Sequence, residues 1–185
     1  NDRTLIDHGW AGQVWLETAR GTVRARTAIV TVPTNVLAVE GVRFDPPLPD
    51  KVAAAQGLPL GLANKVFLRL DTPEELPRDA HLIGNPRASR TGAYHMRPFG
   101  RPVIEGYFGG TLARALENEG DAAAEAFALD ELVALLGESF RKRARLLVCT
   151  AWGHVPTIGG SYAFARPGSA GQRAVLAAPI NDCLF

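Results

Sequence analysis

The sequence predicts an α/β protein of the α+β kind, in which a mixed β-sheet is flanked by helices. Segments typical of strands alternate along the chain with segments typical of helices, and such interleaving is accommodated by packing helices against a sheet. The chain has 185 residues, of which 46% are hydrophobic and 21% are charged. This length and composition suffice for a globular protein with a substantial core.

The first elements are predicted to be strands. Residues 13–18 and 22–25 alternate between apolar and polar side chains, and residues 19–21 make a short turn between them, so this region predicts a β-hairpin. The apolar run 28–32 ends at Pro33. A continuous run of this kind predicts a strand that is buried on both faces.

Two short helices are predicted next. Residues 35–39 form a helical turn, and the three prolines of residues 44–49 exclude regular helix there, because proline removes amide donors and fixes φ. Asp50 is expected to be the N-cap of a helix that runs to about Gln56 and ends at Gly57.

The middle of the chain predicts three strands and then helices. Residues 62–71, 94–96 and 102–108 have strand patterns, and a helical region opens at residues 109–111. Residues 125–136 form the strongest predicted helix. Its expected apolar stripe consists of Ala126, Leu129, Leu132, Val133 and Leu136.

The last predicted elements are a strand over residues 146–152 and a short helix over residues 172–176. Gly137 is expected to end the helix before this strand. The basic cluster formed by residues 141–145 fits either a phosphate site or a solvated helix end. The second is favoured, because cations stabilise the carboxyl end of a helix.

Charge and cysteine content exclude some classes of partner and binding site. The formal net charge is +1, so there is no electrostatic case for a nucleic acid or an anionic membrane as partner. Cys149 and Cys183 have no CxxC spacing and the four histidines have no metal-ligand spacing, so no metal site is predicted. No apolar run reaches the roughly 18 residues that span a bilayer. The simplest expectation is a reduced, cytoplasmic protein.

The chain ends suggest a fragment of a longer protein. The sequence begins with Asn1 rather than Met and ends on the apolar residues 183–185, whereas natural termini are usually polar and exposed. The sequence also lacks common nucleotide-binding and hydrolase motifs. There is no G-x-G-x-x-G, no G-x-x-x-x-G-K-[ST] and no G-x-S-x-G, so neither a nucleotide-binding loop nor a hydrolase elbow is predicted.

Four segments together resemble the flavin-containing amine oxidase (flavin monoamine oxidase) family, which includes monoamine oxidases, polyamine oxidases and flavin-type histone lysine demethylases. These segments are residues 28–37, residues 44–49 followed by Lys51, residues 61–68, and Trp152 with 159–162 and 167–168. Their order and spacing cover almost the whole chain. The resemblance implies the carboxy-terminal half of such a protein, without the amino-terminal FAD-binding loop and the final flavin-binding segment.

The resemblance also implies a domain organisation. Residues 1–37 correspond to strands of a partial FAD-binding domain, and residues 40–166 correspond to the substrate-binding domain. Residues 167–185 would return toward the FAD domain.

Lys65 is the first catalytic residue that the resemblance implies. By alternation, Lys65 shares a strand face with Phe67 and Arg69, opposite Val66 and Leu68, and taken alone it is a solvated strand residue. The family places a lysine here beside flavin N5, bridged by water. A cation at that position would stabilise the negative charge that develops when oxygen is reduced.

Tyr162 is the second catalytic residue that the resemblance implies. Taken alone, it is a core aromatic residue after a Gly-Gly turn. In the family, a tyrosine at this place forms one wall of an aromatic cage in front of the flavin. Because such a slot is desolvated, it would lower the pKa of the amine and favour the neutral form that is oxidised.

The cofactor-binding residues implied by the resemblance are Val32, Pro33, Trp152, Gly160 and Ser161. Taken alone, Val32 and Pro33 mark the end of a strand, Trp152 is a core residue on a strand, and Ser161 is a turn residue. Animal monoamine oxidases carry a flavin-linked cysteine at the position of Ser161, and a serine cannot form that thioether. The implied FAD is therefore non-covalent. The sequence departs from many relatives at residues 153–156, which carry a histidine before the valine and proline.

The implied activity is FAD-dependent oxidation of a small-molecule amine to an imine, and then to an aldehyde or ketone, with oxygen reduced to hydrogen peroxide. The fragment alone is expected to be inactive. One alternative is a flavin-dependent desaturase or a protoporphyrinogen-type oxidase, and another is a non-catalytic binding domain. The sequence names neither the amine nor the oligomeric state, and a homo-oligomer stays open.

Overall fold

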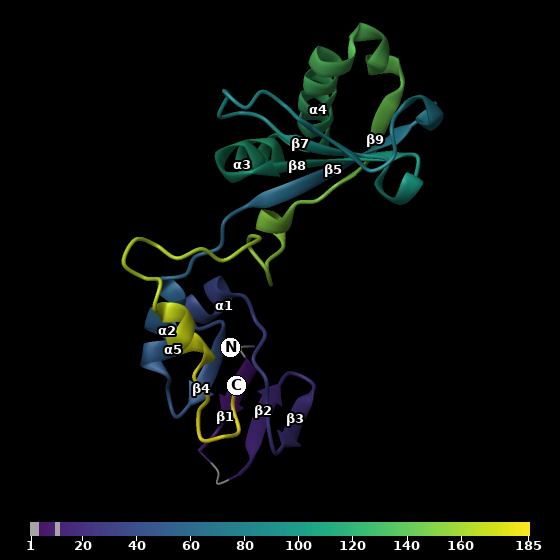
Figure 1. The fold of residues 1–185 in the computed structure, drawn as a ribbon. Helices are drawn as coiled ribbons and strands as arrows, with labels where there is room; N and C mark the ends of the chain where they lie inside the picture. Colours follow the sequence, from purple (N-terminus) through teal and green to yellow (C-terminus); the bar gives the residue numbers. More distant parts are fainter. Residues whose placement is uncertain (1–3, 10–11) are drawn as a thin grey trace. The chain divides into compact units, whose positions relative to one another are not determined.

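The computed structural model describes residues 4–9 and 12–185, which divide into two compact units (Figure 1). Unit 1 comprises the chain up to Leu60 together with residues 156–159 and 163–185, and unit 2 comprises residues 61–155 and 160–162. Two sheets with helices against them confirm the predicted α/β class. The predicted domains drew a boundary near residue 40, whereas the compact units divide at residue 60, and the functional assignment of those domains stays a prediction.

Unit 1 contains a four-stranded mixed sheet of order β3-β2-β1-β4. The strands are β1 Thr4–Asp7, β2 Val14–Thr18, β3 Gly21–Ala25 and β4 Val42–Asp45. Strands β2 and β3 form the predicted hairpin, with Val14 opposite Ala25 and Thr18 opposite Gly21. Strand β4 pairs with β1 in parallel, and its position was not predicted. A small core of Ile6, Val14, Cys183 and Leu184 lies against this sheet.

The helices of unit 1 are α1 Thr34–Ala38, α2 Pro49–Gln56 and α5 Gln172–Ala177. All three were predicted, but the N-cap of α2 was wrong. The cap is Leu48, Pro49 is the first helical residue, and Asp50 lies in the first turn. Proline at that position is favoured because its missing N–H would have no partner inside the helix. Gly57 ends α2 as expected.

The predicted buried strand at residues 28–32 is not present in unit 1. Only Ala28 forms a bridge, with Leu184, and backbone hydrogen bonds tie Ala28 and Val30 to Cys183 and Phe185. Among the described residues, the backbone neighbours of this segment are therefore residues 183–185. The side chain of Ile29 is 74% exposed, so the run is apolar without being buried on both faces.

Unit 2 contains a five-stranded antiparallel sheet of order β6-β7-β8-β5-β9. The strands are β5 Ala63–Leu70, β6 Ala80–Ile83, β7 Ala93–Met96, β8 Val103–Gly109 and β9 Ala144–Cys149. Strands β5, β7 and β8 match their predictions, and β6 was not predicted. The chain also makes short 3-10 turns at η1 Pro73–Glu75, η2 Pro98–Gly100, η3 Glu138–Lys142 and η4 Trp152–His154.

Helices α3 Gly110–Glu119 and α4 Asp121–Leu136 lie against one face of this sheet (Figure 1). Val66 and Leu68 of β5 pack there with residues of both helices. The residues of α4 that are buried are Ala124, Ala128, Leu132 and Val133. The predicted stripe was therefore partly wrong, since Ala126 and Leu136 are exposed. Helix α4 begins four residues earlier than predicted, and packing on the sheet selects its buried face.

A carboxylate on α4 ties the β6–β7 connection to the helix. Glu131 accepts hydrogen bonds from Thr91 Oγ1 at 2.6 Å, from the Gly92 amide at 2.9 Å and from the Tyr94 hydroxyl at 2.7 Å. Because hydrogen bonds to a charged acceptor are comparatively strong, Glu131 fixes this connection.

The basic cluster after α4 includes the exposed helix end that was favoured for it, since Arg141 and Lys142 occupy the last turn of η3. Arg141 pairs with Asp130, Arg143 with Glu75, and Arg145 with Asp71. These contacts join η3 and β9 to neighbouring elements of unit 2. Within residues 4–9 and 12–185, no helix is both long and apolar enough to cross a membrane.

Candidate active site

The face of the unit 2 sheet opposite the helices carries a row of ionisable side chains. Pairing of β5 with β8 sets Lys65 opposite Tyr107 and Phe67 opposite Glu105. Pairing of β8 with β7 sets Glu105 opposite His95, and His95 lies opposite His81 of β6. Because alternate residues share a face, these side chains lie together on the open side of the sheet.

Lys65 forms an ion pair with Glu105 on this face. The hydrogen bond to the Glu105 carboxylate raises the pKa of the Lys65 ammonium above its ordinary value, and desolvation by burial offsets part of this rise. The Lys65 side chain is 39% exposed. The position is therefore a charged, partly accessible one on the face that alternation predicted.

A cavity of about 250 Å³ lies beside this ion pair. It is lined by Lys65, His81, Ala93, Tyr94, His95, Glu105, Tyr107 and Tyr162. The rings of His81 and His95 are stacked with centroids 4.4 Å apart, and His95 Nε2 lies 3.4 Å from Asp79 Oδ1. The Tyr162 side chain is 67% exposed, so it is not the core aromatic residue that its sequence context suggested. The structure brings Lys65 and Tyr162 to one cavity.

Ser161 holds the segment that carries Tyr162 against the start of β5. Its hydroxyl accepts a hydrogen bond from the Ala63 amide at 3.0 Å and donates one to the Ala63 carbonyl at 2.7 Å. Backbone bonds join Ser161 N to Gly61 O and Gly61 N to Tyr162 O, both at 2.8 Å. Gly160, directly before this segment, is buried. The serine therefore positions Tyr162 next to the strand that carries Lys65.

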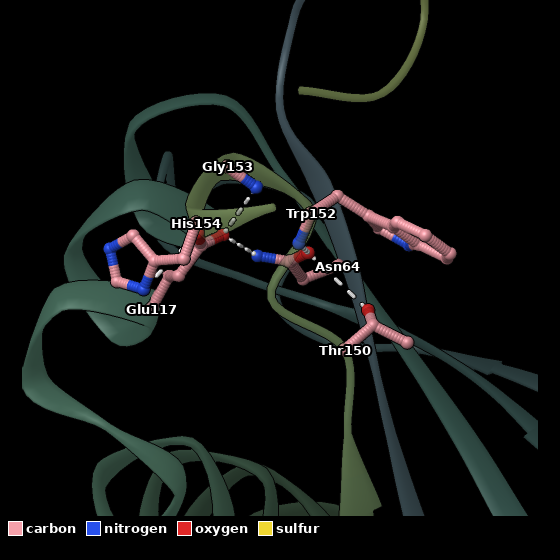
Figure 2. Close-up of polar contacts among 6 residues, drawn as sticks. All are labelled: Asn64, Glu117, Thr150, Trp152, Gly153 and His154. Atoms are coloured by element: carbon pink, nitrogen blue, oxygen red, sulfur yellow. Dashed lines mark hydrogen bonds and ion pairs between the residues drawn. The ribbon is translucent and has the colours of Figure 1, made fainter. Parts of the chain in front are cut away.

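Behind Lys65, a buried polar network joins β5 to the turn η4 (Figure 2). Asn64 donates from Nδ2 to Glu117 Oε2, and its Oδ1 accepts from the Trp152 amide at 3.2 Å and the Thr150 hydroxyl at 3.3 Å. The Gly153 amide also donates to Glu117 Oε2, at 3.3 Å. The network thus fixes the backbone at Trp152 and Gly153.

Sequence reasoning missed this network, although one signal was available. Asn64 lies on the strand face of Val66 and Leu68, where the other side chains are apolar. A polar side chain at such a core position requires hydrogen-bond partners. Nothing in the sequence alone identified Glu117 as that partner, because it lies 53 residues away on a helix.

Trp152 lies in the turn η4 and not on a strand as predicted, because β9 ends at Cys149. Its side chain is 41% exposed, so it is not a core tryptophan. Asn64 and Glu117 hold the amides of Trp152 and Gly153, which leaves the indole ring free of the core.

The other two predicted cofactor residues belong to unit 1. Val32 lines an apolar cavity of about 150 Å³ together with residues of α1, β4 and α5. Pro33 is the N-cap residue of α1. Among the described residues of either unit, no group of three or more His, Cys, Asp or Glu side chains could hold a metal ion.

Sequence comparison identifies relatives over most of the chain. Residues 4–182 match the family of flavin containing amine oxidoreductases. The lysine-specific histone demethylase 1 homolog 2 of Oryza sativa subsp. japonica is 32% identical over 97% of this chain and 25% of that protein. The probable polyamine oxidase 4 of Arabidopsis thaliana is 33% identical over 76% of this chain and 28% of that protein.

Solved structures share the fold. A putrescine oxidase bound to putrescine superimposes with a TM-score of 0.77 at 19% identity, over 98% of this chain and 41% of that one. The cyclohexylamine oxidase of Brevibacterium oxydans gives a TM-score of 0.72 at 21% identity, over the same shares. The chain thus spans between a quarter and about two fifths of these relatives. Since the family match covers nearly every residue, the chain belongs to the flavin-containing amine oxidoreductase family.

Proposed function

We propose that the protein containing this chain is an FAD-dependent amine oxidase. It oxidises a small-molecule amine to an imine, which water converts to an aldehyde or ketone, and it reduces oxygen to hydrogen peroxide. The observation that carries the proposal is the arrangement of Lys65 and Tyr162 around one cavity on the open face of the unit 2 sheet. The names of the relatives, which include polyamine, putrescine and cyclohexylamine oxidases, support an amine as substrate.

The residues present fit a bound flavin. Trp152 and Tyr162 are aromatic side chains that are 41% and 67% exposed, and flat rings of this kind pack against a flat heterocycle. The Ser161 hydroxyl is engaged on both sides by Ala63, which suits a cofactor that is held without a covalent bond. Gly160 directly precedes Ser161 and Tyr162.

When bound, the flavin supplies the electron acceptor for the amine and passes those electrons to oxygen. Lys65 supplies a fixed positive charge. Since oxygen is neutral and its reduction develops negative charge, a nearby ammonium stabilises the transition state more than the ground state. Glu105 keeps Lys65 protonated, because its hydrogen bond raises the pKa of the ammonium.

Tyr107 and Tyr162 act on the substrate amine, whereas Lys65 acts on oxygen. Tyr162 and Tyr107 both line the cavity and both are exposed in unit 2, so their rings are available to a substrate. A substrate amine between such rings is partly desolvated. Desolvation disfavours its ammonium form and lowers its pKa, which increases the fraction of the neutral amine that can be oxidised.

Replacement of Lys65 tests the proposal. Lys65→Met in the flavin-loaded full-length protein keeps the length of the side chain but removes the charge. We expect the oxygen-consuming half-reaction to slow roughly a hundredfold, which corresponds to about 3 kcal/mol. The amine-consuming half-reaction should change much less, because it develops no comparable negative charge beside Lys65. Stopped-flow absorbance separates the two half-reactions.

The matched control is Lys142→Met, which removes an exposed cation in the turn η3 of the same unit. It should leave both half-reactions unchanged. An oxygen step within about twofold of wild type in Lys65→Met would contradict the role of Lys65. A wild-type protein that forms no hydrogen peroxide with primary amines, diamines or polyamines would contradict the activity itself.

A further inference from the structure

Glu117 on α3 is a buried carboxylate that is not among the residues lining the cavity beside Lys65. Its side chain is 2% exposed. Burial of a charged group costs several kcal/mol unless hydrogen bonds or an opposite charge compensate. Here two donors converge on Oε2, from the side chain of Asn64 and the amide of Gly153. The carboxylate therefore holds two separate segments at one point.

The second oxygen of Glu117 faces a different group. Glu117 Oε1 is buried and has no hydrogen-bond partner among the described residues, and His154 Nδ1 lies 3.6 Å from it. His154 is the third residue of the turn η4. Oε2 of Glu117 thus meets Gly153 of this turn and the side chain of Asn64, and Oε1 lies near His154 of the same turn (Figure 2).

Asn64 transmits this anchoring to the strand that carries Lys65. Asn64 precedes Lys65 on β5, and its Oδ1 accepts hydrogen bonds from Thr150 Oγ1 and the Trp152 amide. The Thr150 hydroxyl in turn accepts from the Lys65 amide at 2.8 Å, and the Thr150 amide donates to the Lys65 carbonyl at 2.9 Å. Both backbone groups of Lys65 are therefore bound to a residue that Asn64 contacts.

We propose that Glu117 is a positioning residue that fixes Lys65 and Trp152 through Asn64 without touching substrate or cofactor. The inference rests on the proposed function of Lys65. The carboxylate suits this task because its Oε2 accepts both hydrogen bonds and the group donates none. Charge-assisted bonds are also shorter and stronger than bonds between neutral groups. A small shift of the β5 backbone would move the Lys65 ammonium, and displacement of a catalytic group lowers the rate steeply.

The test compares Glu117→Met with Glu117→Gln in the flavin-loaded full-length protein. Methionine keeps the length but accepts no strong hydrogen bond, whereas glutamine retains one carbonyl acceptor for Asn64 and Gly153. We expect Glu117→Met to slow the oxygen-consuming half-reaction about tenfold and Glu117→Gln to restore most of the rate. In a Lys65→Met background, Glu117→Met should add less than about twofold, because residues that act through one another are not additive.

Amide hydrogen exchange reports on positioning independently of activity. In Glu117→Met, peptides that cover residues 150–154 should exchange faster than in wild type. The Gly153 amide loses its acceptor, and Asn64, which holds the Trp152 amide, loses the acceptor of its own Nδ2 group. The matched control is Glu131→Met on α4, which removes a carboxylate that accepts three hydrogen bonds in another part of unit 2. It should loosen residues 84–94 and leave the exchange of residues 150–154 unchanged.

Two results would overturn the inference. One is unchanged exchange over residues 150–154 in Glu117→Met, and the other is an equally large rate loss in the Lys65→Met background. A failure of the proposed function would give a different set of results from a failure of this inference. If Lys65→Met alone left the oxygen step unchanged, the role of Lys65 would be contradicted, while faster exchange in Glu117→Met would still support Glu117 as the anchor of this turn.

Discussion

At the residue scale, the ion pair between Lys65 and Glu105 sets the pH range of the site. The carboxylate raises the pKa of Lys65 above the ordinary value of 10.5, so the ammonium persists to higher pH than in a free lysine. A group whose pKa is raised by folding stabilises the folded state fully below its ordinary pKa. The contribution is lost as the pH rises through the raised value, which places the loss above about pH 10.5.

We predict that Glu105→Gln moves the alkaline limb of the oxygen-consuming half-reaction to lower pH. Glutamine keeps the shape of the side chain but removes the charge that favours the ammonium form. The measurement is the pH dependence of that half-reaction by stopped flow. Glu75→Gln is the control, because Glu75 pairs with Arg143 and does not line the cavity. An alkaline limb at the same pH in Glu105→Gln and wild type would rule out this role of the pair.

Ser161 predicts how the cofactor is held. Serine has no thiol to form a thioether, and its hydroxyl is already bound to both backbone groups of Ala63. Acid precipitation of the flavin-loaded full-length protein should therefore release intact FAD into the supernatant. Absorbance spectra of supernatant and pellet check this, and yellow colour that stays with the pellet would show a covalent link.

Individual residues of the site differ in how far the sequence could predict them. The alternation of apolar and polar side chains along β5 correctly placed Lys65 on the face opposite Val66 and Leu68, because the helices bury only one face of the sheet. Glu117 could not be found in this way. Its partner Asn64 is remote in sequence, and only the packing of α3 against β5 brings them together.

At the element scale, the predictions were correct where the local sequence pattern is strong. They were wrong where pairing with a distant strand determines whether a strand forms. The hairpin of β2 and β3, the long strand β5 and the helix α4 all have clear periodicity. Strand β4 is defined by its parallel pairing with β1, which no local pattern shows. The prediction of a buried strand over residues 28–32 was wrong for the opposite reason. The apolar side chains suggested burial, but the unit 1 sheet does not bury them on both faces.

Strand β8 has a position where only glycine fits. Gly106 lies opposite Val66 on β5 and Tyr94 on β7. A Cβ atom there would lie 2.7 Å from Val66 Cγ1 and 3.1 Å from the nearest ring atom of Tyr94. We predict that Gly106→Ala destabilises the protein by about 1–3 kcal/mol, because the sheet must shift to admit the methyl group.

Thermal unfolding of the flavin-loaded protein measures this effect, with Gly109→Ala as the matched control at the end of the same strand. A Cβ atom at Gly109 would meet nothing closer than the Leu62 carbonyl oxygen at 4.0 Å. The control should therefore retain the wild-type melting temperature. Equal melting temperatures for the two variants would contradict the close packing of β8.

At the scale of the whole molecule, the sequence lacks one motif that commonly holds a dinucleotide. The 185 residues carry no G-x-G-x-x-G motif, and in dinucleotide-binding folds the amides of that loop and the following helix hold the pyrophosphate. We predict that the isolated chain, purified with excess FAD and desalted, is colourless. Circular dichroism should show that it is folded, and stoichiometric flavin absorbance in the visible spectrum would refute the prediction.

The division of the chain between the units has a consequence for synthesis. Unit 2 is nearly continuous, over residues 61–155 and 160–162, whereas unit 1 needs residues 163–185 to complete it. Ala28 pairs with Leu184, and Lys51 donates to carbonyls at the end of α5. Since domains fold as units while the chain emerges from the ribosome, unit 2 can form first. The part of unit 1 that precedes it must wait until residues 163–185 have been translated.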